Sequence, residues 1–140
     1  NHGTYDRIPA QEMEMEHLRH TMKANFEGAV NVWKVIQPHL APQANMVVVS
    51  SQLATRGSAH GADYAASKAA LSTWARSLAL AVGPEGKRVN VLAPGYVDTD
   101  ILAGDSDEKR NQRIQEVPLK RIGTGEDMAS IVSFLFKYFI

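Results

Sequence analysis

Apolar residues recur at helical spacing over the first part of the chain, from about Gln11 to Gln37. This spacing predicts one long helix, which Pro38 helps to end because a proline lacks a backbone donor. Asn25 falls on the apolar stripe of this helix, so we expect its amide to be buried and hydrogen-bonded. The apolar members of the stripe are Leu18, Met22, Ala29, Trp33 and Ile36.

Two short apolar runs predict strands. The run Met46–Val49 in "NMVVVSS" is unbroken and rich in β-branched residues, which is typical of a parallel strand covered on both faces. The segment "RVNVLAP", Arg88–Pro94, predicts the second strand. Between them we expect a loop over Gln52–Gly61 and a helix from about Tyr64 to Val82, which "GPEG" ends.

The last third of the chain is polar first and apolar afterwards. The segment "GDSDEKRNQRIQE", Gly104–Glu116, is charged enough to predict a mobile surface segment. The residues "TGED", Thr124–Asp127, resemble a capping box and predict the start of a third helix. The apolar face of that helix comprises Met128, Ile131, Val132, Leu135 and Phe139.

The predicted order of elements is helix, strand, helix, strand, helix. This alternation favours an α/β fold with parallel strands joined by right-handed crossovers. Two strands make a thin sheet, and their apolar runs require more neighbours than these 140 residues supply. The chain also starts without Met and stops inside the third predicted helix. We therefore expect residues 1–140 to form one partial domain, a piece of a larger α/β domain.

Charge and composition exclude several classes of function. Fifteen basic and fifteen acidic residues give no net charge, so we expect no nucleic-acid partner. The longest apolar run, Ile131–Ile140, is short and interrupted by Lys137, so we expect no membrane span. The five histidines lack metal-ligand spacing, and we expect no metal. The absence of cysteine excludes thiolate chemistry and favours a reducing, cytoplasmic location.

The helix predicted from Tyr64 begins with a phenol and an ammonium four residues apart, in "YAASKAAL". Tyr64 and Lys68 lie within about 40° of the apolar line of this helix, which places both on its inward stripe. Because an unpaired buried ammonium is unfavourable, Lys68 either reaches solvent at the helix end or faces a cleft beyond the strand ends. Ser51, just after the first strand, lies at the edge where open α/β sheets bind ligands.

These three side chains together predict a proton-transfer site. Free tyrosine titrates at about pH 10, and the cation of Lys68 one helical turn away should lower the pKa of Tyr64 toward neutrality. The Ser51 hydroxyl can hold a substrate oxygen beside the phenol. Such a site moves a proton to or from an alcohol or carbonyl oxygen, and the accompanying hydride would require a cofactor.

Several motifs in order resemble the short-chain dehydrogenase/reductase family, most closely its 3-oxoacyl-carrier-protein reductases. They are a Ser thirteen residues before the Tyr (Ser51), Tyr-x-x-x-Lys in "YAASKAAL", and "RVNVLAPGYVDT" (Arg88–Thr99). A helix-borne Asn in "KANFEGAV" (Asn25) and the segment "PLKRIGTGEDMASIVSFL" also match the family pattern. The first residues, "NHG", resemble the family's Asn-Ala-Gly, with His2 in place of Ala.

The resemblance implies the C-terminal half of a doubly wound Rossmann-like parallel sheet. It also implies an NAD- or NADP-dependent oxidoreductase that interconverts a secondary alcohol and a ketone, with a 3-oxoacyl, sugar or polyol substrate. Tyr64 would be the general acid or base, Lys68 would lower its pKa, and Ser51 would polarise the substrate oxygen. Asn25 would hold a water that relays protons toward Lys68. The implied cofactor-binding residues are Asn1, Gly3, Tyr64, Lys68, Pro94, Gly95, Val97 and Thr99.

The resemblance implies further that Gly104–Glu116 is a substrate lid and that the full-length protein is a homodimer or homotetramer. The family's first strand and Gly-rich dinucleotide turn, which decide between NAD and NADP, should precede Asn1, and a last strand should follow Ile140. These 140 residues alone should then be inactive. Two alternatives stay open, namely an incompetent fragment or assembly module, and a nucleotide-sugar epimerase or dehydratase that also uses Tyr-x-x-x-Lys.

Overall fold

The computed structural model describes residues 3–138, and its elements follow the predicted alternation of helices and parallel strands. The predicted α/β fold class is therefore confirmed. Contacts divide the chain into two units, Asn1–Ala93 and Pro94–Ile140, which are described separately. The predictions for Asn1, His2 and Phe139 lie outside the described residues.

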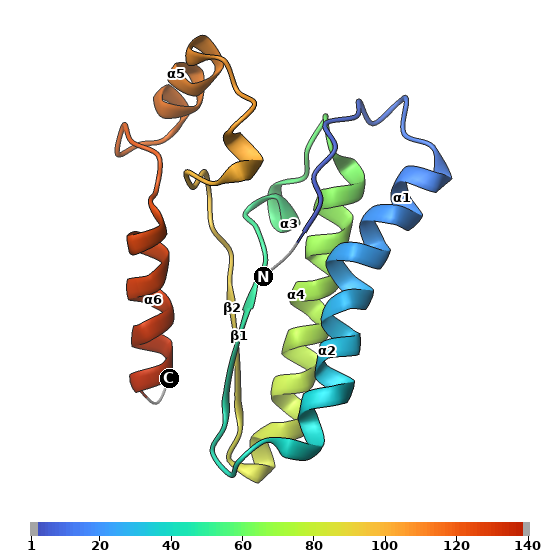
Figure 1. Ribbon diagram of the computed structural model, residues 1–140, viewed down its shortest axis with the longest axis vertical. Helices are drawn as coiled ribbons and strands as arrows, with labels where there is room; N and C mark the ends of the chain where they lie inside the picture. Colours follow the sequence, from blue (N-terminus) through green and yellow to red (C-terminus); the bar gives the residue numbers. More distant parts are fainter. Residues whose placement is uncertain (1–2, 139–140) are drawn as a thin grey trace. The chain divides into compact units, whose positions relative to one another are not determined.

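The sheet of the first unit has two parallel strands, β1 (Asn45–Val49) and β2 (Arg88–Leu92). Both strands coincide with the predicted apolar runs, and Ser50 N extends their pairing by donating to Leu92 O at 2.7 Å. In β1 only Val48 is buried, and β2 is half-buried throughout. The helices of the first unit pack along one face of this sheet (Figure 1), and cover on both faces of β1 stays a prediction.

The helix α4 (Ala62–Val82) covers the sheet and contacts both strands (Figure 1). It begins two residues before the predicted start, directly after Gly61, and ends in the short 3-10 helix η3 (Gly83–Glu85). Its buried residues Leu71 and Ala75 form the core with Val48 of β1. The inward stripe predicted for this helix therefore does face the sheet.

The long first helix is interrupted and begins at Met15, four residues later than predicted. It consists of α1 (Met15–Met22), one turn of π-helix η1 (Lys23–Glu27) and α2 (Gly28–Ile36), followed by the 3-10 turn η2 (Gln37–His39). The reciprocal bonds between Glu14 and His17 cap its start, and Pro38 lies inside the 3-10 turn. The π-turn matters for the site because inserting a residue re-aims the side chains around it.

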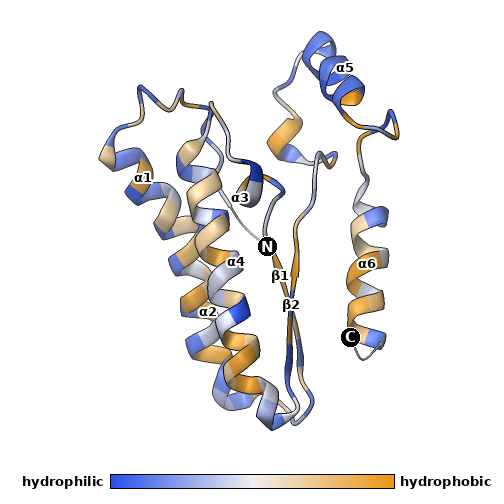
Figure 2. Ribbon diagram, turned by 180° about the vertical axis from the view of Figure 1, so that it is seen from behind, coloured by the Kyte–Doolittle hydropathy of each residue, from blue (hydrophilic) through white to orange (hydrophobic). Residues whose placement is uncertain are grey.

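Helices also occur in the segment predicted as a loop and in the segment predicted as a mobile surface segment. The predicted loop over residues 52–61 includes α3 (Leu53–Arg56), one short helical turn. The charged segment Gly104–Glu116, predicted as mobile, mostly forms α5 (Asp107–Glu116), which Ser106 caps by accepting from Lys109 N. The segment lies at the surface, as predicted, and α5 is hydrophilic along most of its length (Figure 2), whereas its mobility stays a prediction.

In the second unit, α5 is held by pairs that join it to the preceding turns around η4 (Asp100–Leu102). Arg110 donates to both carboxylate oxygens of Asp98 at 3.0 and 2.7 Å, and Arg113 pairs with the buried Asp105. The following helix α6 (Gly125–Lys137) starts at the predicted Thr124–Asp127 capping box, which is confirmed. Over residues 3–138, no helix has the length and apolarity that crossing a membrane requires.

Replacing Leu71 by Ala is expected to lower the free energy of unfolding by about 2–5 kcal/mol, because it opens a cavity between α4 and β1. Urea denaturation followed by circular dichroism measures this change. The matched control is Leu80→Ala on the same helix, where the side chain is 82% exposed and the expected change is below about 0.5 kcal/mol. Equal losses for the two variants would contradict the assignment of the core.

Candidate active site

The carboxyl end of β1 and the first turns of α4 bring Ser51, Tyr64 and Lys68 together in the first unit. All three side chains are buried, and the Ser51 hydroxyl is close enough to the Tyr64 phenol to favour a lower pKa of that phenol. Ser51 Oγ also accepts from Leu53 N at 3.2 Å, so the α3 turn fixes the position of the hydroxyl. A phenol and a hydroxyl in contact at a sheet edge can both address one substrate oxygen.

Lys68 directs its ammonium into the protein rather than to solvent. Its Nζ donates to Val49 O at 3.1 Å, the last carbonyl of β1, and lies 5.7 Å from the centroid of the Tyr64 ring. The residue is 5% exposed, which rules out the alternative in which it reaches solvent at the helix end. Burial lowers the pKa of Lys68 because it disfavours the charged form.

The expected lowering of the Tyr64 pKa is wrong for this structure. Burial raises the pKa of Tyr64 above its ordinary value, because the phenolate loses its hydration. The hydrogen bond with Ser51 acts in the opposite direction, and the neighbouring Tyr5 adds to the increase. The Lys68 ammonium is hydrogen-bonded to the Val49 carbonyl. The phenol is protonated at neutral pH, as an ordinary tyrosine is.

Asn25 is buried in the π-turn η1 and is hydrogen-bonded, as predicted from its position on the apolar stripe. Its Oδ1 accepts from Thr4 N at 2.8 Å, and its Nδ2 donates to Thr4 O and Ser67 Oγ at 3.0 Å each. Ser67 Oγ in turn donates to Tyr64 O at 2.8 Å. Asn25 thus ties the N-terminal segment to the first turn of α4, and the water relay stays a prediction.

The surroundings of Gly3 fit a ligand that carries hydroxyl groups. A Cβ on Gly3 would lie 3.0 Å from Asn25 Oδ1 and 3.8 Å from Lys68 Nζ. Glycine at this position therefore leaves room for a ligand to approach the Lys68 ammonium. Within residues 3–138, the buried Thr4 Oγ1 has no hydrogen-bond partner, which is uncommon for a buried hydroxyl. The Lys68 ammonium has three donors, of which one goes to Val49 O. The remaining donors suit ribose hydroxyls.

Several buried polar residues that support the site were missed in the sequence. Ser50 Oγ contacts Ser72 Oγ at 2.6 Å and donates to Lys68 O at 3.0 Å, which joins the end of β1 to α4. Thr21 Oγ1 donates to Asp63 Oδ2 at 2.6 Å, which joins α1 to the residue before Tyr64. The signal available in the sequence was a polar residue on the inward side of a predicted helix. The same signal identified Asn25.

The structure does not bring every predicted site residue to Tyr64. Asn1 lies outside the described residues, and Pro94, Gly95, Val97 and Thr99 belong to the second unit. There, Val97 pairs with Gly123 in a parallel bridge, and Thr99 Oγ1 donates to Val97 O at 3.4 Å. Their assignment to the cofactor stays a prediction.

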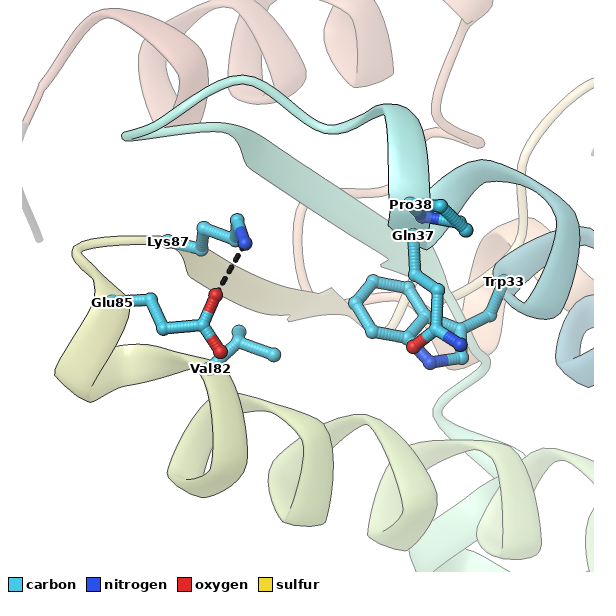
Figure 3. Close-up of a pocket in the computed structure, with 6 residues that line it drawn as sticks. All are labelled: Trp33, Gln37, Pro38, Val82, Glu85 and Lys87. Atoms are coloured by element: carbon cyan, nitrogen blue, oxygen red, sulfur yellow. Dashed lines mark hydrogen bonds and ion pairs between the residues drawn. The ribbon is translucent and has the colours of Figure 1, made fainter.

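A pocket in the first unit lies at the other end of α4 from Tyr64. Val82, which lines it, is the last residue of α4, so it is about 27 Å from Tyr64 along the helix axis. Figure 3 shows the Lys87–Glu85 ion pair across this pocket from Trp33. No buried, unpaired polar group among the described residues points to a ligand there. The proton-transfer site at the Tyr64 end stays a prediction.

Comparisons with known proteins show the family to which the chain is similar. A family profile described as "Enoyl-(Acyl carrier protein) reductase" matches residues 1–138. The chain is 36% identical over 125 residues to the 3-oxoacyl-[acyl-carrier-protein] reductase FabG of Chlamydia muridarum, covering 88% of this chain and 50% of that protein. The chain thus spans about half the length of the curated relatives it matches.

Solved structures are also similar to the chain. The 3-oxoacyl-[acyl-carrier protein] reductase of Brucella melitensis superposes with a TM-score of 0.90 at 26% identity, covering 97% of this chain and 54% of that one. A second Brucella melitensis structure, described as a short-chain dehydrogenase/reductase of the glucose/ribitol dehydrogenase type, gives a TM-score of 0.89 at 29% identity, covering 96% and 54%. The chain belongs to the short-chain dehydrogenase/reductase family.

Proposed function

We propose that this member of the short-chain dehydrogenase/reductase family carries the proton-transfer site of an NAD(P)-dependent oxidoreductase that interconverts a secondary alcohol and a ketone. The observation that supports this most is the burial of Ser51, Tyr64 and Lys68 together, with Lys68 Nζ 5.7 Å from the centroid of the Tyr64 ring. The names of the similar proteins favour a 3-oxoacyl substrate, with sugars or polyols as the other class.

Each residue has a stated task in carbonyl reduction. The Ser51 hydroxyl donates to the substrate oxygen and orients it, and the Tyr64 O–H transfers its proton to the same oxygen. A bound nicotinamide dinucleotide supplies the hydride to the carbonyl carbon. Lys68 and Thr4 offer donors to the ribose hydroxyls, and Gly3 keeps that approach open. In alcohol oxidation, the Tyr64 phenolate accepts the proton instead.

The Tyr64 phenol is protonated at neutral pH, as an ordinary tyrosine is, so it can act as the acid in reduction. Burial raises its pKa, which makes the phenolate that oxidation needs scarcer. The exposed Val35 of α2 and Leu80 of α4 support the expectation of a homodimer or homotetramer in the full-length protein.

A product assay tests the proposal and separates the alternatives. The protein, together with any longer natural form that contains these residues, is incubated with NADH or NADPH and a 3-oxoacyl thioester, and the loss of nicotinamide absorbance is followed. Formation of the 3-hydroxyacyl product supports the proposal, and a sugar or polyol series tests the second substrate class. Reduction of an enoyl thioester alone, or epimerisation without net change in free cofactor, would contradict it.

Nicotinamide fluorescence distinguishes the incompetent fragment from the enzyme. Residues 1–140 alone are expected to bind the dinucleotide poorly, whereas a longer natural form binds it saturably. Saturable, tight binding by residues 1–140 alone would contradict the expectation that the dinucleotide site is incomplete. A longer form that binds dinucleotide but transfers no hydride to any carbonyl would favour an assembly module.

A further inference from the structure

A second tyrosine lies directly against the proposed acid. The ring centroids of Tyr5 and Tyr64 are 4.6 Å apart, and the ring planes meet at 38°. The Tyr5 hydroxyl donates to His60 O at 2.9 Å, so the far end of the ring is anchored to the loop before α4. Close aromatic pairs of this kind are favourable beyond the area that they bury, and they restrict the movement of both rings.

The segment that carries Tyr5 is itself fixed to that loop. Pro9 and His60 form an antiparallel bridge, and Gly61 N donates to Ile8 O at 2.9 Å. On the other side of Tyr5, both backbone polar groups of Thr4 bond to the Asn25 amide. Tyr5 is therefore held between two anchored stretches of backbone, and its contact with Tyr64 is a built feature of the first unit.

Gly61 makes the space that the Tyr5 ring occupies. Its φ is +118°, a conformation that residues with a Cβ rarely adopt. A Cβ at this position would lie 2.3 Å from Cε2 of Tyr5 and 3.2 Å from two other ring atoms. Any larger residue at position 61 must move the ring of Tyr5, and with it the covering of Tyr64.

We propose that Tyr5 is a positioning residue of the site: its ring holds the Tyr64 phenol beside Ser51 and keeps water from the face that it covers. Gly61 is the residue that admits this ring. The expected effect of Tyr5 on turnover rests on the proposed function. Its expected effect on the pKa of Tyr64 does not. Removing the ring lets water reach the phenolate, so the pKa of Tyr64 moves down toward the ordinary value of 10.0.

Three variants test separately the Tyr5 ring, the hydrogen bond that anchors it and the space at Gly61 that it occupies. Tyr5→Leu removes the ring, and Tyr5→Phe keeps the ring but loses the bond to His60 O. Gly61→Ala displaces Tyr5 without altering it. The matched control is Gly57→Ala, because Gly57 also has a positive φ of +73° but no atom within 4 Å of its Cβ position.

The readout is the pH titration of Tyr64 by NMR of the protein labelled at tyrosine Cζ, with the signal assigned through Tyr64→Phe. In Tyr5→Leu and Gly61→Ala the signal should begin to move at lower pH than in the parent. Turnover of the full-length protein should also fall by about ten- to a hundredfold, mainly in kcat, because the phenol is misplaced. Tyr5→Phe should restore the parent titration and most of the turnover, and Gly57→Ala should match the parent.

Two results would overturn the inference. One is a Tyr64 titration in Tyr5→Leu that coincides with the parent, and the other is an equal effect of Gly57→Ala and Gly61→Ala. Circular dichroism verifies that each variant is folded, and the two glycine variants decide the matter if Tyr5→Leu does not fold. Failure of the proposed function would appear in a different experiment. If the proposed function is wrong, Tyr64→Phe leaves turnover intact, regardless of how the Tyr5 variants change the pH titration of Tyr64.

Discussion

Tyr64→Phe is expected to reduce hydride transfer by about a hundredfold to ten-thousandfold, which is the range attributed to a positioned general acid. The variant removes one oxygen and keeps the aromatic ring, so the contact with Tyr5 is preserved. Only the O–H that faces Ser51 is lost. The measurement is kcat for reduction and for oxidation, with cofactor at saturation.

The matched control for this substitution is Tyr138→Phe. Tyr138 lies in the second unit and is 48% exposed, so its replacement should leave both rates unchanged. Turnover of Tyr64→Phe within a factor of a few of the parent would remove the assignment of Tyr64 as acid and base. A large loss in both variants would instead indicate a general effect of removing a phenol.

The raised pKa of Tyr64 also gives the two directions of the reaction different pH dependences. Reduction uses the protonated phenol, which is the predominant form at every pH below its pKa, so its rate should be level from neutral pH into the alkaline range. Oxidation uses the phenolate, whose fraction rises with pH, so its rate should rise over the same range. This difference should disappear in Tyr64→Phe.

Lys68→Met is expected to separate activity from stability. Methionine has a similar length without the charge, so the donors toward Val49 O and the substrate side are lost together. Turnover should fall by at least about a hundredfold, because the donors proposed to bind the ribose hydroxyls are lost. The thermal midpoint should rise at neutral pH, because a buried ammonium disfavours the folded state.

The sign of the pH effect follows from the lowered pKa of Lys68. The unfolded chain keeps this ammonium protonated up to about its ordinary pKa of 10.5, whereas the folded protein releases the proton at lower pH. The destabilising effect of Lys68 is therefore complete below the folded pKa, and it fades as pH rises toward 10.5. The difference in thermal midpoint between Lys68→Met and the parent should therefore become smaller as pH rises over that interval.

Thermal unfolding at a series of pH values measures this narrowing. The control is Lys34→Met on the exposed side of α2, where no gain in thermal midpoint is expected. A midpoint for Lys68→Met that is lower than the parent at neutral pH would show that the ammonium stabilises the fold. That outcome would contradict the unfavourable burial inferred here.

The parts of the site that follow from regular periodicity were predictable from the sequence. A helix fixes which side chains share a face, so Tyr64 and Lys68 could be placed on the buried stripe before the fold was known. The apolar run of β1 placed Ser51 at the carboxyl end of a strand, where ligands bind in this fold class. The family resemblance rested on the same residues, and it agrees with the profile match over residues 1–138.

The parts that depend on irregular backbone or on distant contacts were not predictable. The π-turn at Asn25 is a one-residue insertion without a composition signal, yet it determines what the Asn25 amide contacts. The contact between Tyr5 and Tyr64 joins residues far apart in the sequence. The direction of the Tyr64 pKa shift depends first on burial, which the helical spacing of Tyr64 and Lys68 does not show.

The second unit contains a helix that the sequence analysis did not predict. The charge density of Gly104–Glu116 indicated solvation and motion, because the partners of its cations could not be seen in the sequence. Arg110 and Arg113 pair with carboxylates that precede the helix, and Ser106 caps it. Charge content alone does not distinguish a solvated segment from a helix whose charges are paired, since both are hydrophilic.

The two-stranded sheet has a consequence for handling the protein. Over residues 3–138, β1 and β2 pair only with each other, so each strand has one side whose backbone donors and acceptors have no strand partner. Such edges act as templates for extended segments of other chains, and the β-branched run of β1 carries neither proline nor charge to oppose this. Concentrated samples are therefore prone to intermolecular strand addition, and a charged residue introduced on an edge is the rational remedy.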